Sequence, residues 1–177
     1  IAPWLSLTPS LGIRETIYSK GLNADDGNKR LDSFTRESFD ISAQIRGPRV
    51  EKIYILKNKY IPKVKHLIEP RLTYNFIPDL DEKDRNKIKV FDGIDSLKEQ
   101  SQLTYSLTQR VLQKELRKDD SFSTRAILRF DVSQTYDLIE ATGSESPENP
   151  QPFSDIRFDL DSRLHDNLEF NIDTTFD

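Results

Sequence analysis

The sequence predicts an all-β protein, an antiparallel up-and-down meander of about seven to eight long strands. Period-2 alternation of apolar and polar residues recurs along most of the 177 residues, whereas helical periodicity is scarce. Segments rich in Gly, Pro, Asn and Asp separate the alternating stretches, as expected for loops and turns. The whole of 1–177 is therefore expected to belong to a single domain.

The predicted strands follow one another along the chain. They cover 5–17, 38–46, 66–76, 103–111, 125–138, 156–164 and 168–176, with a possible eighth over 50–56. In each of the seven, leucine, isoleucine, valine or an aromatic residue occupies every second position over most of the strand, against serine, threonine or charged residues. Ile127 is an exception, because it falls on the polar side of its strand. Most of these strands exceed the length of about 5 to 6 residues that is usual in globular proteins.

The connections differ in length. Long polar loops are expected over 19–33, 78–100 and 140–152, and a tight hairpin turn over 165–167. Long loops on one side and short turns on the other are typical of bacterial outer-membrane barrels. The lysine-rich connection 47–63 fits this layout poorly, and 95–100 is the one segment expected to form a helical turn.

Composition excludes several classes of protein. A net charge of −4 argues against a nucleic-acid interface, which needs a basic stripe. Cysteine is absent, so this chain has no disulfide or thiolate metal site, and no run of 18 apolar residues predicts a membrane helix. The sequence opens without Met and shows no signal peptide, so we expect a piece of a longer chain.

Alternation alone leaves two environments open. In a soluble β-sandwich the apolar face is a core and the polar face meets water. In an outer-membrane barrel the apolar face meets lipid and the polar face lines a wet lumen, with strands of about 9 to 11 residues crossing the bilayer. Strand length and the charges repeated on the polar side favour an arc of a large barrel.

Several motifs occur in a fixed order. They comprise His66, Glu69, Pro70, Arg71 and Tyr74 in HLIEPRLTYNF; Phe91 and Asp92 in FDGID; Tyr105, Thr108 and Arg110 in LTYSLTQRV; and Gln134 and Tyr136 in FDVSQTYDL. With the hairpin over 155–177, this set resembles the C-terminal barrel of the LptD family of lipopolysaccharide-assembly proteins of the Gram-negative outer membrane. The resemblance runs from about residue 35 to the end.

The resemblance implies a non-enzymatic function. Family members form a translocon whose barrel of about 26 strands delivers lipopolysaccharide to the outer leaflet. It implies a plug lipoprotein of the LptE type in the lumen. It also implies contact with periplasmic lipopolysaccharide-bridge proteins through an N-terminal domain that 1–177 lacks. Seven strands supply only an arc of such a wall.

Arginines recur on the polar side of the predicted strands. The candidate lumen-facing residues are Arg46, Arg71, Arg110, Arg125, Arg129, Arg157 and Arg163. They could meet lipopolysaccharide phosphates or carboxylates of the plug, because guanidinium binds both bidentately. The simpler interpretation is cross-strand pairing with the acidic residues of the same face. Pro70 is interpreted as architectural, since a strand proline is tolerated at a bulge or a poorly paired position.

Other sites are not expected. His66 and His165 stand alone, without metal-ligand spacing, and neither NADDGN nor DLDEKD has the register of a calcium loop. We expect no cofactor, no metal and no catalytic residues. Two alternatives remain: a soluble all-β module that binds through its loops, and another outer-membrane barrel such as a porin or receptor.

Overall fold

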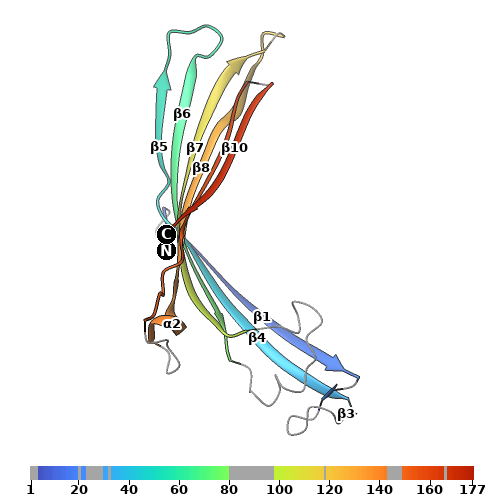
Figure 1. The fold of residues 1–177 in the computed structure, drawn as a ribbon. Helices are drawn as coiled ribbons and strands as arrows, with labels where there is room; N and C mark the ends of the chain where they lie inside the picture. The colour runs from blue at the N-terminus through green and yellow to red at the C-terminus, as the bar shows by residue number, and fades with distance from the viewer. Residues whose placement is uncertain are drawn as a thin grey trace.

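The computed structural model shows one twisted antiparallel sheet of eight strands (Figure 1). The structure describes residues 4–19, 21–22, 30–31, 33–79, 98–117, 119–142, 149–165 and 167–177. The strands are β1 (Ser6–Tyr18), β4 (Phe34–Arg46), β5 (Val50–Ile55), β6 (Lys63–Ile77), β7 (Gln100–Leu116), β8 (Phe122–Asp137), β9 (Ile156–His165) and β10 (Leu168–Phe176). Their order is β1-β4-β6-β7-β8-β9-β10, with β5 also pairing β6. The predicted all-β meander is confirmed.

The sheet is a single layer without a packed core. Leu67, 4% exposed, is the only buried hydrophobic side chain among the described residues. Large apolar side chains stand open instead, with Ile13 83% and Ile172 54% exposed. Both faces of the sheet are therefore exposed and could contact other molecules. In the described part, β1 and β10 are edge strands with one partner each.

β4 and β5 act as one long strand interrupted at 47–49. Both run antiparallel to β6: Arg46 pairs with Arg71, and Val50 pairs with Ile68. Three residues of one strand therefore face two of the other, which is the residue count of a β-bulge. The connection 47–63, which fitted the predicted layout of loops and turns poorly, thus contains the bulge and the possible eighth strand, which is confirmed.

Pro70 lies opposite this interruption. Its carbonyl oxygen accepts a hydrogen bond of 3.0 Å from the Gly47 amide, so its backbone polar groups point toward the β4–β5 side. In an antiparallel ladder the N–H and C=O of a residue point the same way. The proline therefore removes a donor where the neighbouring strand is already broken, and its pairing with Leu107 of β7 continues without a register shift.

A second bulge explains the exception in the alternation of β8. Val111 pairs with Leu128 and Leu112 pairs with Ala126, so Ile127 is the extra residue. Alternation resumes on the opposite phase beyond a bulge of this kind, because one inserted residue exchanges the two faces. Regular alternation over the predicted strand 125–138 would place Ala126 on the same face as Leu128. That expectation is wrong, because the phase of β8 changes at Ile127.

Three short elements were not predicted. A five-residue helix, α2 (Leu138–Thr142), follows β8, so Leu138 is helical and its assignment to a strand is wrong. Asp137 caps the helix: its Oδ1 accepts from the Ile139 amide at 2.9 Å and from the Glu140 amide at 3.2 Å. β2 (Gly21–Leu22) pairs with β3 (Arg30–Leu31) inside the predicted loop 19–33. The helical turn expected over 95–100 lies largely outside the described residues, and Gln100 begins β7.

The turns joining the late strands are short. β9 ends at His165 and β10 begins at Leu168, which confirms the predicted hairpin turn. Between β7 and β8, the Ser121 hydroxyl, at 2.7 Å, and then the Ser121 amide, at 3.2 Å, donate to Asp119 and lower the pKa of its carboxyl group. The ionised Asp119 carboxylate stabilises the turn at pH values above its ordinary pKa. This stabilisation is lost as the pH falls through the lowered pKa of the folded protein. In the described part no helix is both long and apolar enough to cross a membrane.

We predict that Gly47→Ala destabilises the sheet through Pro70. A β-carbon at position 47 would lie 2.9 Å from the Pro70 Cγ atom, too close for an undistorted contact. Overpacking of this kind costs about 1 to 3 kcal/mol. The loss is measured as the thermal midpoint of the full-length folded protein, from its heat-dependent mobility on gels. Gly47→Ala combined with Pro70→Ala should recover most of the midpoint; an equally low midpoint in the double variant would contradict this explanation.

Candidate functional site

The register divides the side chains of the central sheet between two faces. We call the "apolar face" the side that carries Ile45, Leu72, Leu107, Val132, Phe158 and Ile172. We call the "charged face" the opposite side, which carries Arg46, Arg71, Arg110, Arg129, Arg157 and Arg163. The division holds from β4 to β10, because each pair of neighbours keeps a regular antiparallel register through the middle of the sheet.

The charged face is organised in rows across the strands. One row is acidic and runs through Glu69, Thr108, Asp131, Asp159 and Asp173, each opposite the next. Two residues away on one side lies a row with Arg46, Arg71 and Arg157, and on the other side a row with Arg110 and Arg129. The carboxylates are thus flanked by guanidinium groups on both sides.

Ion pairs link these rows. Arg110 binds Glu69 across β6 and β7, Arg129 Nε lies 2.6 Å from Asp131, and Arg157 lies 2.6 Å from Asp173. Arg163 lies 2.6 Å from Glu169 at the end of the β9–β10 pair. The side chains are partly exposed, so solvent screens these pairs and each contributes little to stability. Their effect is to keep most of the charged face neutral, as the simpler interpretation of the arginines predicted.

The end of the charged face near β4 differs from the rest. Arg46 and Arg71 stand directly opposite each other. Arg46 Nε donates to the Gln44 side chain at 2.9 Å, and neither arginine forms an ion pair with a residue that the structure describes. The bulge at 47–49 lies where the acidic row would continue. The interruption of β4 thus leaves cations without matching carboxylates.

A polar hollow of about 260 Å³ lies at this position. It is lined by five arginines, Arg46, Arg49, Arg71, Arg110 and Arg129, and by the single carboxylate of Glu69. Arg49 was not among the predicted residues, because the strand prediction ended at 46. The Gly47-Pro48 pair that signals a break is the feature that could have found it.

Arg125 lies apart from the other six predicted arginines. It precedes the Ile127 bulge, pairs with Gln113, and its guanidinium lies 3.4 Å from Glu115. The register therefore places Arg125 with Gln113 and Glu115 rather than with Arg110. Its exposure to a lumen stays a prediction.

The motif residues occur on both faces. Glu69, Arg71, Thr108 and Arg110 lie on the charged face, where the Thr108 hydroxyl donates to Asp131. His66, Pro70, Tyr74, Tyr105, Gln134 and Tyr136 lie on the apolar face. Phe91 and Asp92 lie outside the described residues. The motif thus combines a charge arrangement with polar groups embedded in an apolar surface.

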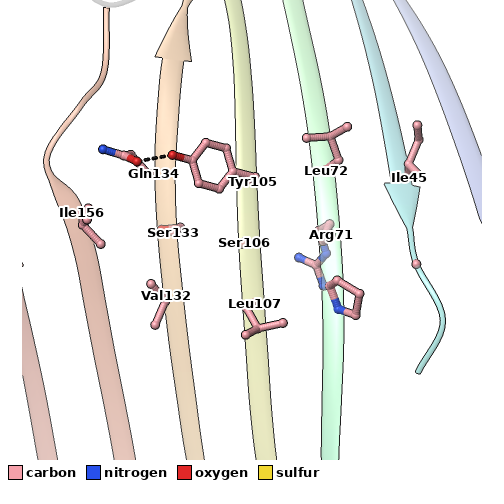
Figure 2. Close-up of a pocket in the computed structure, with 12 residues that line it drawn as sticks. Ile45, Arg71, Leu72, Tyr105, Ser106, Leu107, Val132, Ser133, Gln134 and Ile156 are labelled. Carbon is pink, nitrogen blue, oxygen red and sulfur yellow. Dashed lines mark hydrogen bonds between the residues drawn. The ribbon is translucent and has the colours of Figure 1, made fainter. Parts of the chain in front are cut away.

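The polar groups of the apolar face bind one another. Tyr105 donates its hydroxyl hydrogen to the Gln134 side-chain oxygen (Figure 2). The Gln134 side-chain amide donates in turn to the Ser154 carbonyl oxygen at 2.9 Å. The His66 Nε2 atom lies 3.2 Å from the Gln109 Oε1 atom, and the Tyr74 hydroxyl oxygen lies 3.1 Å from the Ser101 hydroxyl oxygen. Mutual pairing lowers the cost of placing such groups in an apolar medium.

An apolar hollow of about 400 Å³ lies beside the Tyr105–Gln134 pair. Figure 2 shows Ile45, Leu72, Leu107, Val132 and Ile156 around it, from five neighbouring strands. Gly47 and Pro70 line both this hollow and the polar hollow of the charged face. No group of three or more His, Cys, Asp or Glu side chains in the described ranges is placed to hold a metal ion.

The arrangement defines a class of protein. Long antiparallel neighbours with one apolar and one charged face, without a packed core, are typical of the wall of an outer-membrane β-barrel. The model of the family LptD, described as LPS transport system D, matches residues 1–177, the whole chain. The chain belongs to the LptD family, whose members are outer-membrane proteins of Gram-negative bacteria with a role in lipopolysaccharide transport and assembly. A search of curated proteins found no match.

The family match confirms the resemblance and extends it. The sequence motifs carried it from about residue 35 onward, and the match also includes β1 and the loop that follows it. β1 pairs with β4 over 13 residues, from Ser6 opposite Arg46 to Tyr18 opposite Phe34, so it continues the same sheet.

We predict a measurable coupling between Glu69 and Arg110. Glu69→Gln and Arg110→Gln should each lower the free energy of unfolding, and the double variant should lose less than the sum. The coupling should be about 0.5 to 1 kcal/mol, because both side chains are partly exposed. A double-mutant cycle on thermal or denaturant midpoints measures it. Purely additive losses would show that the pair is not formed.

Proposed function

We propose that residues 1–177 form part of the wall of a single transmembrane barrel, the outer-membrane lipopolysaccharide translocon that assembles lipopolysaccharide into the outer leaflet. In this arrangement the apolar face meets lipid and the charged face lines the lumen. The observation that carries the proposal is the pair of opposed faces kept in register from β4 to β10. Membership of the LptD family supports lipopolysaccharide as the transported molecule.

Strand length supports this assignment. β7 has 17 residues, β8 has 16 and β6 has 15. A tilted strand needs about 9 to 11 residues to cross the hydrocarbon core. The central strands are long enough to cross it and project beyond it, and the phase change at Ile127 lies near one end of β8, where the requirement for an apolar outer face ends.

The soluble alternative is poorly supported. A sandwich needs a second layer over the apolar face. In the ranges that the structure describes, the only other sheet is the two-residue pairing of β2 with β3. A porin or receptor shares the barrel wall, but the family match over the whole chain favours the translocon. Transport and assembly by the family give no basis for a catalytic role.

The proposed partners follow from the two faces and the family. The bilayer contacts the apolar face. A plug lipoprotein of the LptE type would face the lumen, where Arg46, Arg71, Arg110, Arg129, Arg157 and Arg163 lie within reach of its carboxylates or of the cargo. Periplasmic lipopolysaccharide-bridge proteins would act through a domain outside 1–177.

We predict that a charge is tolerated on one face and not on the other. Leu107→Arg places a guanidinium in lipid and should cost about 2 to 4 kcal/mol near the bilayer midplane. Thr108→Arg, one residue along β7, should cost much less because the lumen is wet. The readout is the fraction of full-length protein that reaches the membrane in the heat-modifiable folded form.

The pair Phe130→Arg and Ser133→Arg repeats the comparison on β8. Phe130 shares the apolar face with Leu107, whereas Ser133 shares the charged face with Thr108. If the two variants of each pair assembled equally well, on β7 and on β8, the assignment of the apolar face to lipid and of the charged face to the lumen would be wrong.

A further inference from the structure

The charged face carries an unbalanced cluster of cations beside the β4 bulge. Arg46 and Arg71 are directly opposite across β4 and β6, a like-charge arrangement that destabilises a sheet in the absence of a counterion. A second such pair, Arg110 and Arg129, lies across β7 and β8. All four line the polar hollow of about 260 Å³, together with Arg49.

The nearby carboxylates are already engaged. Glu69 binds Arg110, and Asp131 lies 2.6 Å from Arg129. Glu51 lies 2.7 Å from Lys65 and 3.8 Å from Arg49, so it is shared between two cations. The described residues thus provide no further acidic group for Arg46 or Arg71, and the mouth of the hollow keeps a positive surplus.

The composition of the hollow selects the type of anion. Three of the five guanidinium groups that line the hollow have a carboxylate nearby: Arg110 has Glu69, Arg129 has Asp131 and Arg49 shares Glu51. The surplus is therefore about two positive charges, on Arg46 and Arg71. A carboxylate ligand would neutralise one of these charges. A phosphate monoester carries about two negative charges and three acceptor oxygens, so it can take forked hydrogen bonds from several arginines together.

We propose that this hollow is a phosphate-binding site, with Arg46 and Arg71 as its principal ligands and Arg49 at its edge. The inference rests on the proposed function for its place in the lumen, where a phosphorylated glycolipid in transit would present such a group. Bound phosphate converts the Arg46–Arg71 repulsion into a bridged contact between β4 and β6. The site thereby marks one point of the wall at which cargo would be held by charge rather than by apolar contact.

The first experiment measures thermal midpoints of the purified full-length protein with its lipoprotein partner in detergent. Sodium pyrophosphate is compared with sodium chloride at equal ionic strength, which controls for screening. The wild type should gain several degrees in pyrophosphate. Arg71→Gln and Arg46→Gln should lose most of this gain, and in chloride they should be at least as stable as the wild type because the repulsion is removed.

Arg157→Gln is the matched control. It removes a cation from the same face but also breaks the 2.6 Å pair with Asp173. It should lower the midpoint in chloride and keep the gain in pyrophosphate. A gain in Arg71→Gln as large as in the wild type would overturn the site. So would equal losses of the gain in Arg71→Gln and Arg157→Gln, because the effect would then be one of general charge.

The second experiment separates a lipid-linked phosphate from free phosphate. Binding of lipid A and of its enzymatically dephosphorylated form is compared in the same preparation. Arg71→Gln should weaken binding of lipid A about tenfold, or about 1.4 kcal/mol, and leave the dephosphorylated form unchanged. Unchanged binding of lipid A by Arg71→Gln would limit the site to free phosphate and overturn its role in cargo binding.

The experiments distinguish an error in the phosphate-site proposal from an error in the barrel assignment. Arg71→Gln could leave both the pyrophosphate gain and lipid A binding unchanged while Leu107→Arg still blocks assembly. In that case the phosphate site is wrong and the barrel assignment is kept. If Leu107→Arg assembles as well as Thr108→Arg, the lumen itself is wrongly placed.

Discussion

The antiparallel register holds the chain together and decides what each side chain can contact. With a side-chain period of two, a slip of one residue would carry every arginine of the charged face to the apolar face. Aligned neighbours from β4 to β10 prevent this, since each strand fixes the phase of the next. The sheet has no packed core to correct an error, so backbone pairing and the contrast between its two faces carry the fold.

The interruption at 47–49 is the main departure from regular pairing, and both hollows depend on it. Gly47 lets the Pro70 ring approach β4, and Pro70 lacks a backbone donor at the place where β4 is interrupted. On the apolar face the same place is surrounded by aliphatic side chains, and on the charged face by arginines. One local irregularity thus opens space on both faces of the sheet, beside Arg46 and Arg71.

Sequence periodicity predicted the seven long strands, because successive side chains of a strand point to opposite faces of the sheet. Periodicity could not predict the charge rows, because these depend on the register of neighbouring strands. For the same reason it could not predict the ion pair between Glu69 and Arg110. Ile127 was visible as an exception, but only the pairing of Val111 with Leu128 shows that it is a bulge. Helix α2 is too short for periodicity to detect. Arg49 lies beyond the predicted strand 38–46, because Gly47-Pro48 interrupts the alternation on which that prediction rests.

A scan of β7 with single spin labels at positions 103 to 110 of the full-length protein in a bilayer tests most directly which face of the sheet meets lipid. Collision rates with oxygen report lipid exposure, and rates with a water-soluble nickel chelate report a wet lumen. We expect high oxygen access at Leu103, Tyr105 and Leu107, and high chelate access at Thr104, Ser106 and Thr108. The same access at successive positions, or alternation in the opposite phase, would contradict it.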